Sequence, residues 1–188
     1  QARRLALMRA GLLGPAKTGL PTTAGSRPRA AAQAIVERFG YLQLDTVSVA
    51  GARSHALVLL SRLHDLAPEL PEDLLQPGAD LFEYWGHEAC WMPMRLHPHF
   101  AFRRAAFRNH RWWREIVDPH RADADALLER IRTEGPLRSV DLEGKGDGGW
   151  WGWKHGKRIA AALWSSGELA IGERRNFQRT FDLAERVI

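Results

Sequence analysis

The spacing of hydrophobic residues in the first forty positions predicts two helices separated by a loop. Residues 3–13 have a helical pattern that ends at Gly14, and residues 14–28 have the Gly-, Pro-, Thr- and Ser-rich composition of a loop. Residues 29–39 place apolar side chains at helical intervals on one face, and Gly40 follows as a C-terminal cap.

The period changes from helical to alternating in residues 41–49, which are also rich in β-branched side chains. In an extended segment Leu42 and Leu44 point to one side, and the opposite side carries Gln43, Asp45, Val47 and Val49. Two polar side chains therefore occupy positions that a core strand usually fills with apolar ones.

Two further helices are predicted, at residues 54–64 with Ser54 as the N-cap and at residues 94–117. Prolines break the chain between them, before an aromatic run at residues 81–85. The helix at residues 94–117 is expected to be basic on one side and aromatic on the other. It ends at Asp118 and Pro119, which places a domain boundary near residue 118.

The residues after this boundary predict a winged helix-turn-helix. The expected elements are a helix at 122–133, a Gly135-Pro136 turn, a short helix capped by Ser139, a Gly-rich loop, a helix at 154–165, and a hairpin of residues 169–172 and 177–183 around the turn 173–176. In such a unit the third helix enters the major groove of DNA and the hairpin touches its backbone. The predicted fold is mainly α with small β-hairpins, an α+β chain of tandem winged helix-turn-helix units at residues 1–118 and 119–188.

The charge and composition of the chain indicate which classes of protein it can belong to. The 188 residues carry a net charge of +5, and residues 95–188 hold eighteen basic and thirteen acidic side chains against nine of each in residues 1–94. No apolar run approaches the roughly 20 residues that a membrane-spanning helix needs, and the first residues read as a helix and not as a signal peptide. The single cysteine, Cys90, excludes an internal disulfide and suits a reducing cytoplasm.

Gln43 and Asp45 form the first candidate for chemistry, because the i, i+2 spacing on a strand directs both side chains into the same space. A carboxylate can stabilise an oxocarbenium-like transition state or accept a proton from water, and an amide can hold the water or the sugar. The alternative from the residues alone is structural: Asp45 caps the following turn and Gln43 is merely exposed.

His87 and Glu88 lie between two tryptophans, Trp85 and Trp91, a setting expected to bury a polar pair. Such a pair contacts a base or supports the site, or else His87 is a core histidine with its hydrogen bonds satisfied. The spacing of His87, Cys90, His97 and His99 would also be compatible with a zinc site. Prolines interrupt this region, so no metal site is expected.

A tryptophan-rich basic segment opens the helix at residues 154–165. Trp151 and Trp153 stand beside Lys154, Lys157 and Arg158, where a helix N-terminus and basic side chains attract phosphate. The alternative is that the tryptophans pack the core and the basic groups are only solvated.

Five segments, in this order and spacing, resemble those of the YcaQ-type, AlkZ-related DNA glycosylases: GYLQLDTVSV, LFEYWGHEACWMP, GPLRSVDLE, GWWGWKHGKR and ERRNFQRTFDL. Proteins of that family have three tandem winged-helix units followed by a β-barrel and are roughly twice this length. The chain is similar to their first two winged-helix units.

The resemblance implies that Asp45 is the catalytic carboxylate and that Gln43 positions water or the sugar. It implies a glycosylase that hydrolyses N7-alkylated purines and unhooks interstrand crosslinks in double-stranded DNA. None of the four lysines lies beside Gln43 and Asp45 in sequence, which predicts a water-using, monofunctional enzyme. We expect a monomer without cofactor, in the cytoplasm near the nucleoid. The candidate DNA contacts are Arg53, His55, Trp85, His87, Glu88, Trp151, Trp153, Lys154, Lys157, Arg158, Arg174, Arg175 and Asn176. Two other functions fit the residues: a non-enzymatic winged-helix transcriptional regulator, which needs no Gln-x-Asp, and a protein interaction module that uses the tryptophans.

Overall fold

A computed structural model describes residues 1–45, 47, 51–76, 80–142 and 152–188, without the side chains of residues 152–154. The described chain packs as two compact units. Unit 1 contains Gln1–Leu74 and Tyr84–Pro93, and unit 2 contains Leu75–Glu83 and Met94–Ile188. Residue 118, where the sequence suggested a boundary, lies within unit 2.

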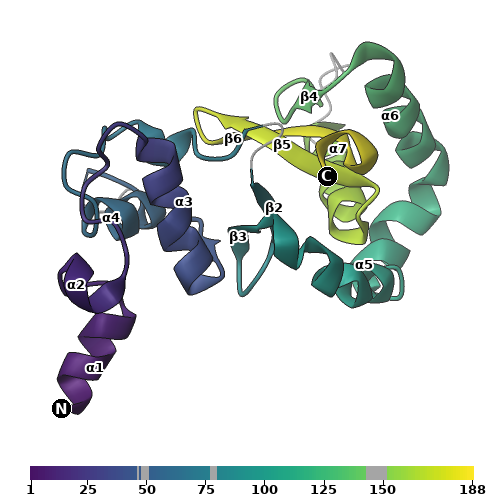
Figure 1. The fold of residues 1–188 in the computed structure, drawn as a ribbon. Coiled ribbons are helices and arrows are strands. Elements are labelled where there is room, and N and C mark those ends of the chain that lie inside the picture. The colour runs from purple at the N-terminus through teal and green to yellow at the C-terminus, as the bar shows by residue number, and fades with distance from the viewer. Residues whose placement is uncertain (46, 48–50, 77–79, 143–151) are drawn as a thin grey trace. The chain divides into compact units, whose positions relative to one another are not determined.

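Unit 1 begins with three helices, and the second and third start at a proline and end before a glycine. Its elements are α1 (Ala2–Arg9), α2 (Pro15–Thr18), α3 (Pro28–Phe39), β1 (Leu42–Gln43), α4 (Ser54–Leu60), the 3₁₀ turn η1 (Leu70–Glu72) and β3 (Ala89–Pro93). Figure 1 labels its four helices and β3. The helix predicted at residues 29–39 is confirmed as α3, with Pro28 in its first turn and Gly40 at φ +78° closing it. Ser54 is the first residue of α4, and the cap position belongs to Arg53, so the predicted Ser54 cap is wrong.

A three-stranded sheet in the order β1-β3-β2 forms the second layer of unit 1. β1 pairs antiparallel with β3, with Leu42 opposite Trp91 and Gln43 opposite Cys90. Beyond β1, the Leu44 N–H donates to the Ala89 carbonyl at 2.8 Å, which continues the pairing by one residue. The edge strand β2 (Leu81–Trp85) runs from unit 2 into unit 1, since Glu83 belongs to one and Tyr84 to the other.

The long helix predicted at residues 94–117 is wrong. The chain instead forms the 3₁₀ segment η2 (Met94–Phe100), helix α5 (Ala101–Phe107) and the π-helical turn η3 (Trp113–Val117), followed by the 3₁₀ turn η4 (Asp118–His120). Pro98 lies inside η2, and His110 Nδ1 accepts the Trp112 N–H at 3.1 Å, so a side chain replaces a helical carbonyl at the break. Both α5 and η3 pack against α7, which draws this segment into unit 2.

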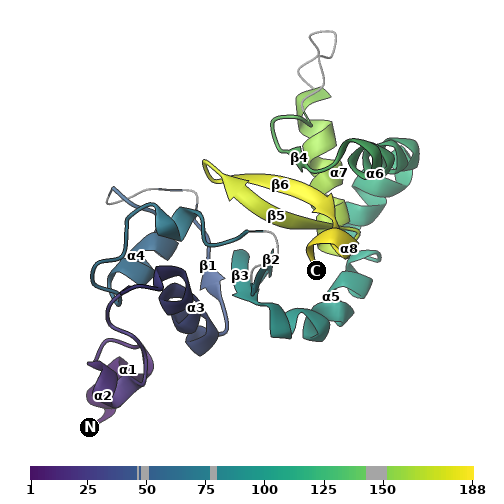
Figure 2. The ribbon, with the colours of Figure 1, turned by 45° about the horizontal axis from the view of Figure 1, so that its top comes forward.

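The remaining elements of unit 2 are α6 (Arg121–Glu134), β4 (Leu137–Arg138), α7 (Gly152–Ser166), β5 (Leu169–Arg175), β6 (Gln178–Leu183) and α8 (Ala184–Val187). The helices predicted at residues 122–133 and 154–165 are confirmed as α6 and α7. Figures 1 and 2 show α7 lying against the β5–β6 hairpin. The predicted Gly-rich loop lies outside the described residues.

The helix predicted after Ser139 is replaced by a turn that follows strand β4. The Asp141 carboxylate accepts hydrogen bonds from the Arg138 N–H at 3.0 Å and from the Arg138 guanidinium at 2.9 Å, which closes the turn. Ser139 donates from its N–H and its hydroxyl to the Arg179 carbonyl at 2.9 and 3.1 Å. These bonds hold the segment beside β6, giving a second sheet in the order β4-β6-β5.

The predicted terminal hairpin is confirmed, but its turn lies further along the chain than expected. β5 continues to Arg175 past an irregularity between Ile171 and Glu173, and the turn is Asn176-Phe177. Both turn residues have positive φ, 49° and 64°, the conformation that matches the twist of paired strands.

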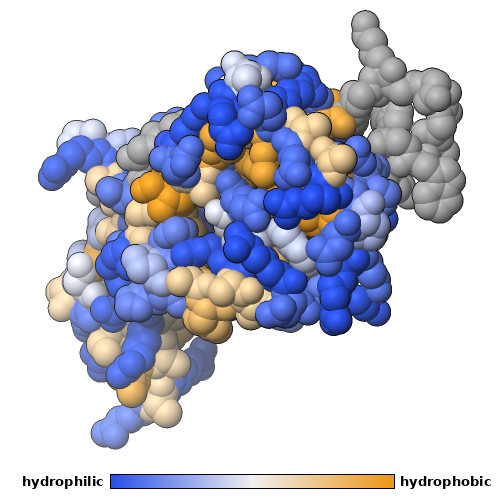
Figure 3. All heavy atoms as spheres, turned by 90° about the vertical axis from the view of Figure 1, so that its right-hand side faces the viewer, coloured by the Kyte–Doolittle hydropathy of each residue, from blue (hydrophilic) through white to orange (hydrophobic). Residues whose placement is uncertain are grey.

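The two sheets share one topology. In each, a helix leads to a short strand, a second helix and a hairpin whose last strand lies in the middle of the sheet. The fold is therefore mixed α+β, as predicted. Among the described residues, none of the helices has the length and apolar character needed to cross a membrane, and the face drawn in Figure 3 is mostly hydrophilic with small separate hydrophobic patches.

Candidate functional site

Strand β1 and the two residues after it alternate between buried apolar and more exposed polar positions, as predicted. Leu42 and Leu44 are buried at 3% and 6% exposure, whereas Gln43 is exposed and Asp45 is partly exposed. The burial of the two leucines fixes which side of this segment faces the core, and Gln43 and Asp45 alternate with them in the sequence. Of the remaining residues in the predicted extended segment, Val47 is exposed, and residues 46 and 48–50 lie outside the description.

The Asp45 carboxylate is oriented by a local turn. Its Oδ1 atom accepts the Val47 N–H at 2.9 Å. This is the turn-capping role that the residues alone suggested as an alternative, and it uses one of the two carboxylate oxygens. Capping and chemistry are therefore compatible here, because the same bond that caps the turn also holds the carboxylate in place.

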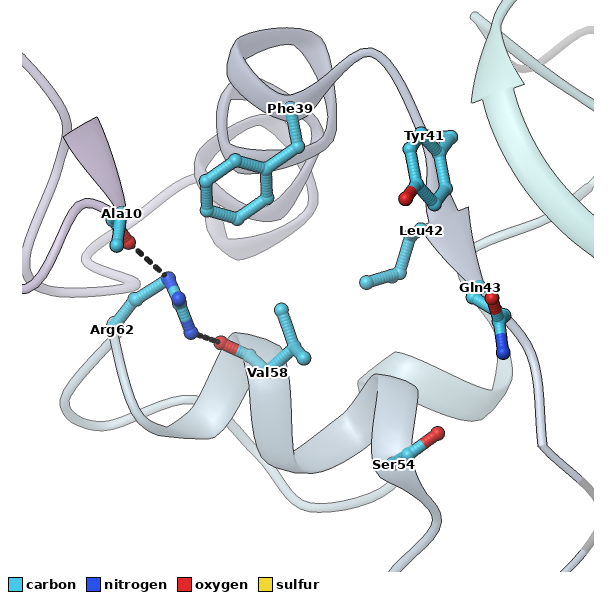
Figure 4. A pocket seen from close by; sticks show the side chains of 8 residues that line it. All are labelled: Ala10, Phe39, Tyr41, Leu42, Gln43, Ser54, Val58 and Arg62. Carbon is cyan, nitrogen blue, oxygen red and sulfur yellow. Dashed lines mark hydrogen bonds between the residues drawn. The ribbon is translucent and has the colours of Figure 1, made fainter. Parts of the chain in front are cut away.

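A pocket of about 420 Å³ lies beside Gln43 in unit 1. Figure 4 shows the eight residues that line it: Ala10, Phe39, Tyr41, Leu42, Gln43, Ser54, Val58 and Arg62. Its volume falls in the range of small-molecule sites, and its wall combines apolar and polar groups. Asp45 is not among the lining residues, so the pocket meets only the Gln43 side of the candidate pair.

Arg62 lines this pocket, and hydrogen bonds hold its side chain in place. Its guanidinium donates to the carbonyls of Ala10 and Val58 at 2.9 and 2.8 Å and lies 5.0 Å from the centre of the Phe39 ring. Burial lowers the pKa of Arg62 from its ordinary value, yet the group stays charged at neutral pH. The pocket therefore carries one positive charge. The sequence analysis did not single out Arg62, because no motif marks it.

The β2–β3 turn brings His87 and Glu88 to the same end of the sheet as Asp45. Because the Leu44 N–H pairs with Ala89, the strand register puts Asp45 level with Glu88. Both turn residues are exposed, and Trp85 before them is half-buried. The expectation that His87 and Glu88 form a buried pair is wrong, because they occupy the hairpin turn and not a core strand.

Arg53 and His55 both contact the Glu72 carboxylate. Arg53 Nη1 lies 3.0 Å from a Glu72 carboxylate oxygen, and His55 Nε2 lies 3.5 Å from the other. His55 is fully buried and meets the Trp91 ring edge-on at 5.4 Å. Direct DNA contact by His55 is therefore excluded and that prediction is wrong, whereas Arg53 remains partly exposed.

The tryptophan-rich basic segment is described only in part. Trp151 lies outside the described residues, and Trp153 and Lys154 belong to α7 without a described side chain. Lys157 and Arg158, further along α7, are both exposed. Their exposure fits both the predicted phosphate contact and the alternative of basic groups that are only solvated.

Arg174 is structural, which corrects its assignment as a DNA contact. It is buried at 6% exposure, and its Nε and Nη2 atoms each donate to a Glu83 carboxylate oxygen at 2.7 Å. Arg179 donates to the same carboxylate at 2.9 Å. Burial alone would raise the pKa of the Glu83 carboxyl, but the hydrogen bonds and charges of Arg174 and Arg179 outweigh it and lower the pKa.

The neighbours of Arg174 at the hairpin tip are exposed. The Arg175 side chain is 73% exposed and lies 3.0 Å from Glu173, and Asn176 forms the turn. The hairpin therefore offers Arg175 and Asn176 to a partner while Arg174 faces inward.

Comparison of the chain with models of known protein families places it in the class of the DNA glycosylases. Residues 36–188 match the family described as DNA glycosylase AlkZ-like. The match covers most of the chain, and the chain belongs to this family. The resemblance found in the sequence motifs is thereby confirmed. No solved structure gave a significant match.

Proposed function

We propose that the protein hydrolyses the N-glycosidic bond of N7-alkylated purines in double-stranded DNA, including both arms of an interstrand crosslink. The observation that supports this proposal is that Gln43, on β1, is exposed and Asp45, two residues further along, is partly exposed, in a chain of the AlkZ-like family. Side chains that are accessible from solvent suit a crosslinked base, because a base tied to the opposite strand is not readily flipped into a snug pocket.

The chemistry needs little acid catalysis. Alkylation at N7 puts positive charge on the purine, which makes it a better leaving group, so the protein mainly has to stabilise the sugar cation and deliver water. Asp45 supplies the negative charge or accepts the proton of water, with its Oδ1 atom held by Val47. Gln43 positions the water or the sugar from the neighbouring pocket.

Water, and not an amine of the protein, is the proposed nucleophile. An amine nucleophile requires a lysine desolvated beside the sugar. Unit 1 contains one lysine, Lys17, which is exposed on α2 and is not among the residues of the Gln43 pocket. We infer a monofunctional enzyme that leaves an intact abasic strand.

Both units are proposed to be winged helices that bind DNA. Their shared order of helix, strand, helix and hairpin, with the last strand central in each sheet, supports this assignment. In unit 2, α7 with Lys157 and Arg158 would approach one groove and the hairpin tip with Arg175 and Asn176 would touch the backbone. In unit 1 the corresponding hairpin turn carries His87 and Glu88.

Asp45→Asn tests the catalytic assignment. Asparagine keeps an oxygen to accept the Val47 N–H and removes only the charge, so the fold should persist while release of N7-methylguanine from a duplex falls about 10²- to 10⁴-fold. Asp65→Asn, the same change at an exposed position of unit 1, should keep the wild-type rate. An Asp45→Asn enzyme with wild-type turnover would remove Asp45 from the mechanism.

Gln43→Ala should slow base release less than Asp45→Asn does, because Gln43 positions a reactant and bears no charge. Single-turnover rates at saturating enzyme separate this effect from weaker DNA binding. A loss larger than that of Asp45→Asn would reverse the proposed roles of the two residues.

A further inference from the structure

Three side chains of unit 2 converge outside the proposed catalytic residues. His120 ends η4, Asp123 lies in the first turn of α6, and His155 lies in α7. One oxygen of Asp123, Oδ2, is 3.0 Å from His155 Nε2 and 3.7 Å from His120 Nδ1. Among the described residues, these three form the group whose ligand atoms all lie within 4.8 Å of one another.

These separations suit a tetrahedral metal ion. Zinc binds histidine nitrogen and carboxylate oxygen at about 2.0–2.2 Å, so two ligand atoms on a tetrahedron lie roughly 3.3–3.5 Å apart. The two measured distances to Asp123 fall on either side of this value. The two imidazole rings are 4.2 Å apart at their centres and 76° from parallel, so they do not stack. Each ring has a nitrogen within 4.8 Å of the other two ligand atoms.

The ligand types indicate which cation fits. Two imidazoles and one carboxylate suit zinc and its neighbours in the first transition row, whereas Mg²⁺ and Ca²⁺ prefer oxygen ligands throughout. His120 and Asp123 are exposed and His155 is half-buried, so an ion can enter from solvent. Three protein ligands leave a fourth position for water or another oxygen.

We propose that His120, Asp123 and His155 bind one Zn²⁺ ion, which clips the start of α6 to α7. The clip would fix α7, the helix that carries the exposed Lys157 and Arg158, by a bond that does not depend on apolar packing. Sequence spacing did not indicate this site, because His155 is 32 residues from Asp123. The site does not share residues with the Gln43 and Asp45 pair. A test of Zn²⁺ binding is therefore independent of the proposed glycosylase activity.

Calorimetric titration of the tag-free, chelator-treated protein with Zn²⁺ tests the proposal. We expect one ion per chain. His120→Ala and His155→Ala should each weaken binding at least tenfold. The matched control is His99→Ala, which removes an exposed histidine of unit 2 from η2, and it should bind Zn²⁺ like the wild type.

Co²⁺ provides a second readout, because four-coordinate Co²⁺ has a visible absorption that hexaaqua Co²⁺ lacks. Wild type and His99→Ala should develop this absorption, and His155→Ala should not. Melting curves without metal show whether each variant is folded. Absence of Zn²⁺ binding by the wild type, or equal affinity in folded His120→Ala and His155→Ala, would overturn the site.

Discussion

Glu83 is a charged residue buried in the core of the protein. It is 3% exposed inside an apolar strand, and it accepts hydrogen bonds from two arginines. Arg174 also donates to the Phe177 carbonyl at 2.8 Å and lies over the Phe177 ring at 4.3 Å, and Arg179 lies over the Trp164 ring at 4.5 Å. The carboxylate is thus one end of a buried network that ties β2 to the β5–β6 hairpin.

Arg174→Ala is expected to lower the free energy of unfolding by about 3–5 kcal/mol, because it leaves a buried carboxylate with one partner fewer. Arg175→Ala changes the next residue along β5 but removes an exposed side chain, so its effect should stay within about 0.5 kcal/mol. Chemical denaturation of both variants measures the difference. Equal stability of the two variants would show that the Glu83 pair does not hold the fold.

At this scale the sequence indicates a residue's role when the reason is local. Burial of Leu42 and Leu44 follows from alternation with period two, and the turn bond from the Val47 N–H to Asp45 is also local. Arg174 was misassigned because its partner is 91 residues away. A single acidic residue within the apolar run at 81–85 was the available signal, since a buried charge needs an opposite one.

At the scale of elements, close packing limits the side chains that α7 can carry. A Cβ atom at Gly156 would lie 2.8 Å from the Leu142 carbonyl oxygen. That oxygen belongs to the turn after β4, so the backbone of the turn rests directly on the helix. The glycine therefore allows a close approach between α7 and the segment that precedes residues 143–151.

Gly156→Ala should destabilise the protein, although alanine usually favours a helix by about 1 kcal/mol over glycine. The added methyl group must displace backbone, and overpacking of this kind typically costs about 1–3 kcal/mol. Thermal melting compares this variant with Gly14→Ala, where an added Cβ meets nothing within 4 Å. A higher melting temperature for Gly156→Ala would show that the turn moves away freely.

Elements with strong local signals could be predicted, and those made by distant pairing could not. Helix α3 has proline at its start and glycine after its end, and the β5–β6 hairpin has its own turn. Strand β4 exists because Ser139 and Arg138 meet Arg179 and Thr180 of β6, about forty residues later. Local pattern at residues 137–142 gives no sign of that partner.

For the whole molecule, charge sets the expected mode of DNA binding. The net charge of +5 arises entirely in residues 95–188, where basic residues exceed acidic ones by five. Contacts to phosphate release counterions and carry no sequence information, so binding should be salt-sensitive and tolerant of sequence. A transcriptional regulator would instead prefer one duplex sequence.

Lys157→Ala and Arg158→Ala should each reduce the slope of log affinity against log salt by about one unit if the side chain contacts a phosphate. Arg132→Ala, an exposed arginine of α6 paired with Glu129 at 2.6 Å, should leave the slope unchanged. Fluorescence anisotropy with an undamaged duplex across a salt series measures all three. An unchanged slope in both α7 variants would remove this helix from the DNA interface.

The sequence separation between Glu83 and Arg174 also sets a delay during synthesis of the chain. The ribosome makes Glu83 91 residues before Arg174, and at about 5–20 residues per second this delay is roughly 5–18 s. Throughout that interval β2 is an apolar nascent segment with an uncompensated carboxylate in its middle. We therefore expect β2 to stay hydrated until the chain has been made at least as far as Arg174, because a buried carboxylate needs a partner of opposite charge.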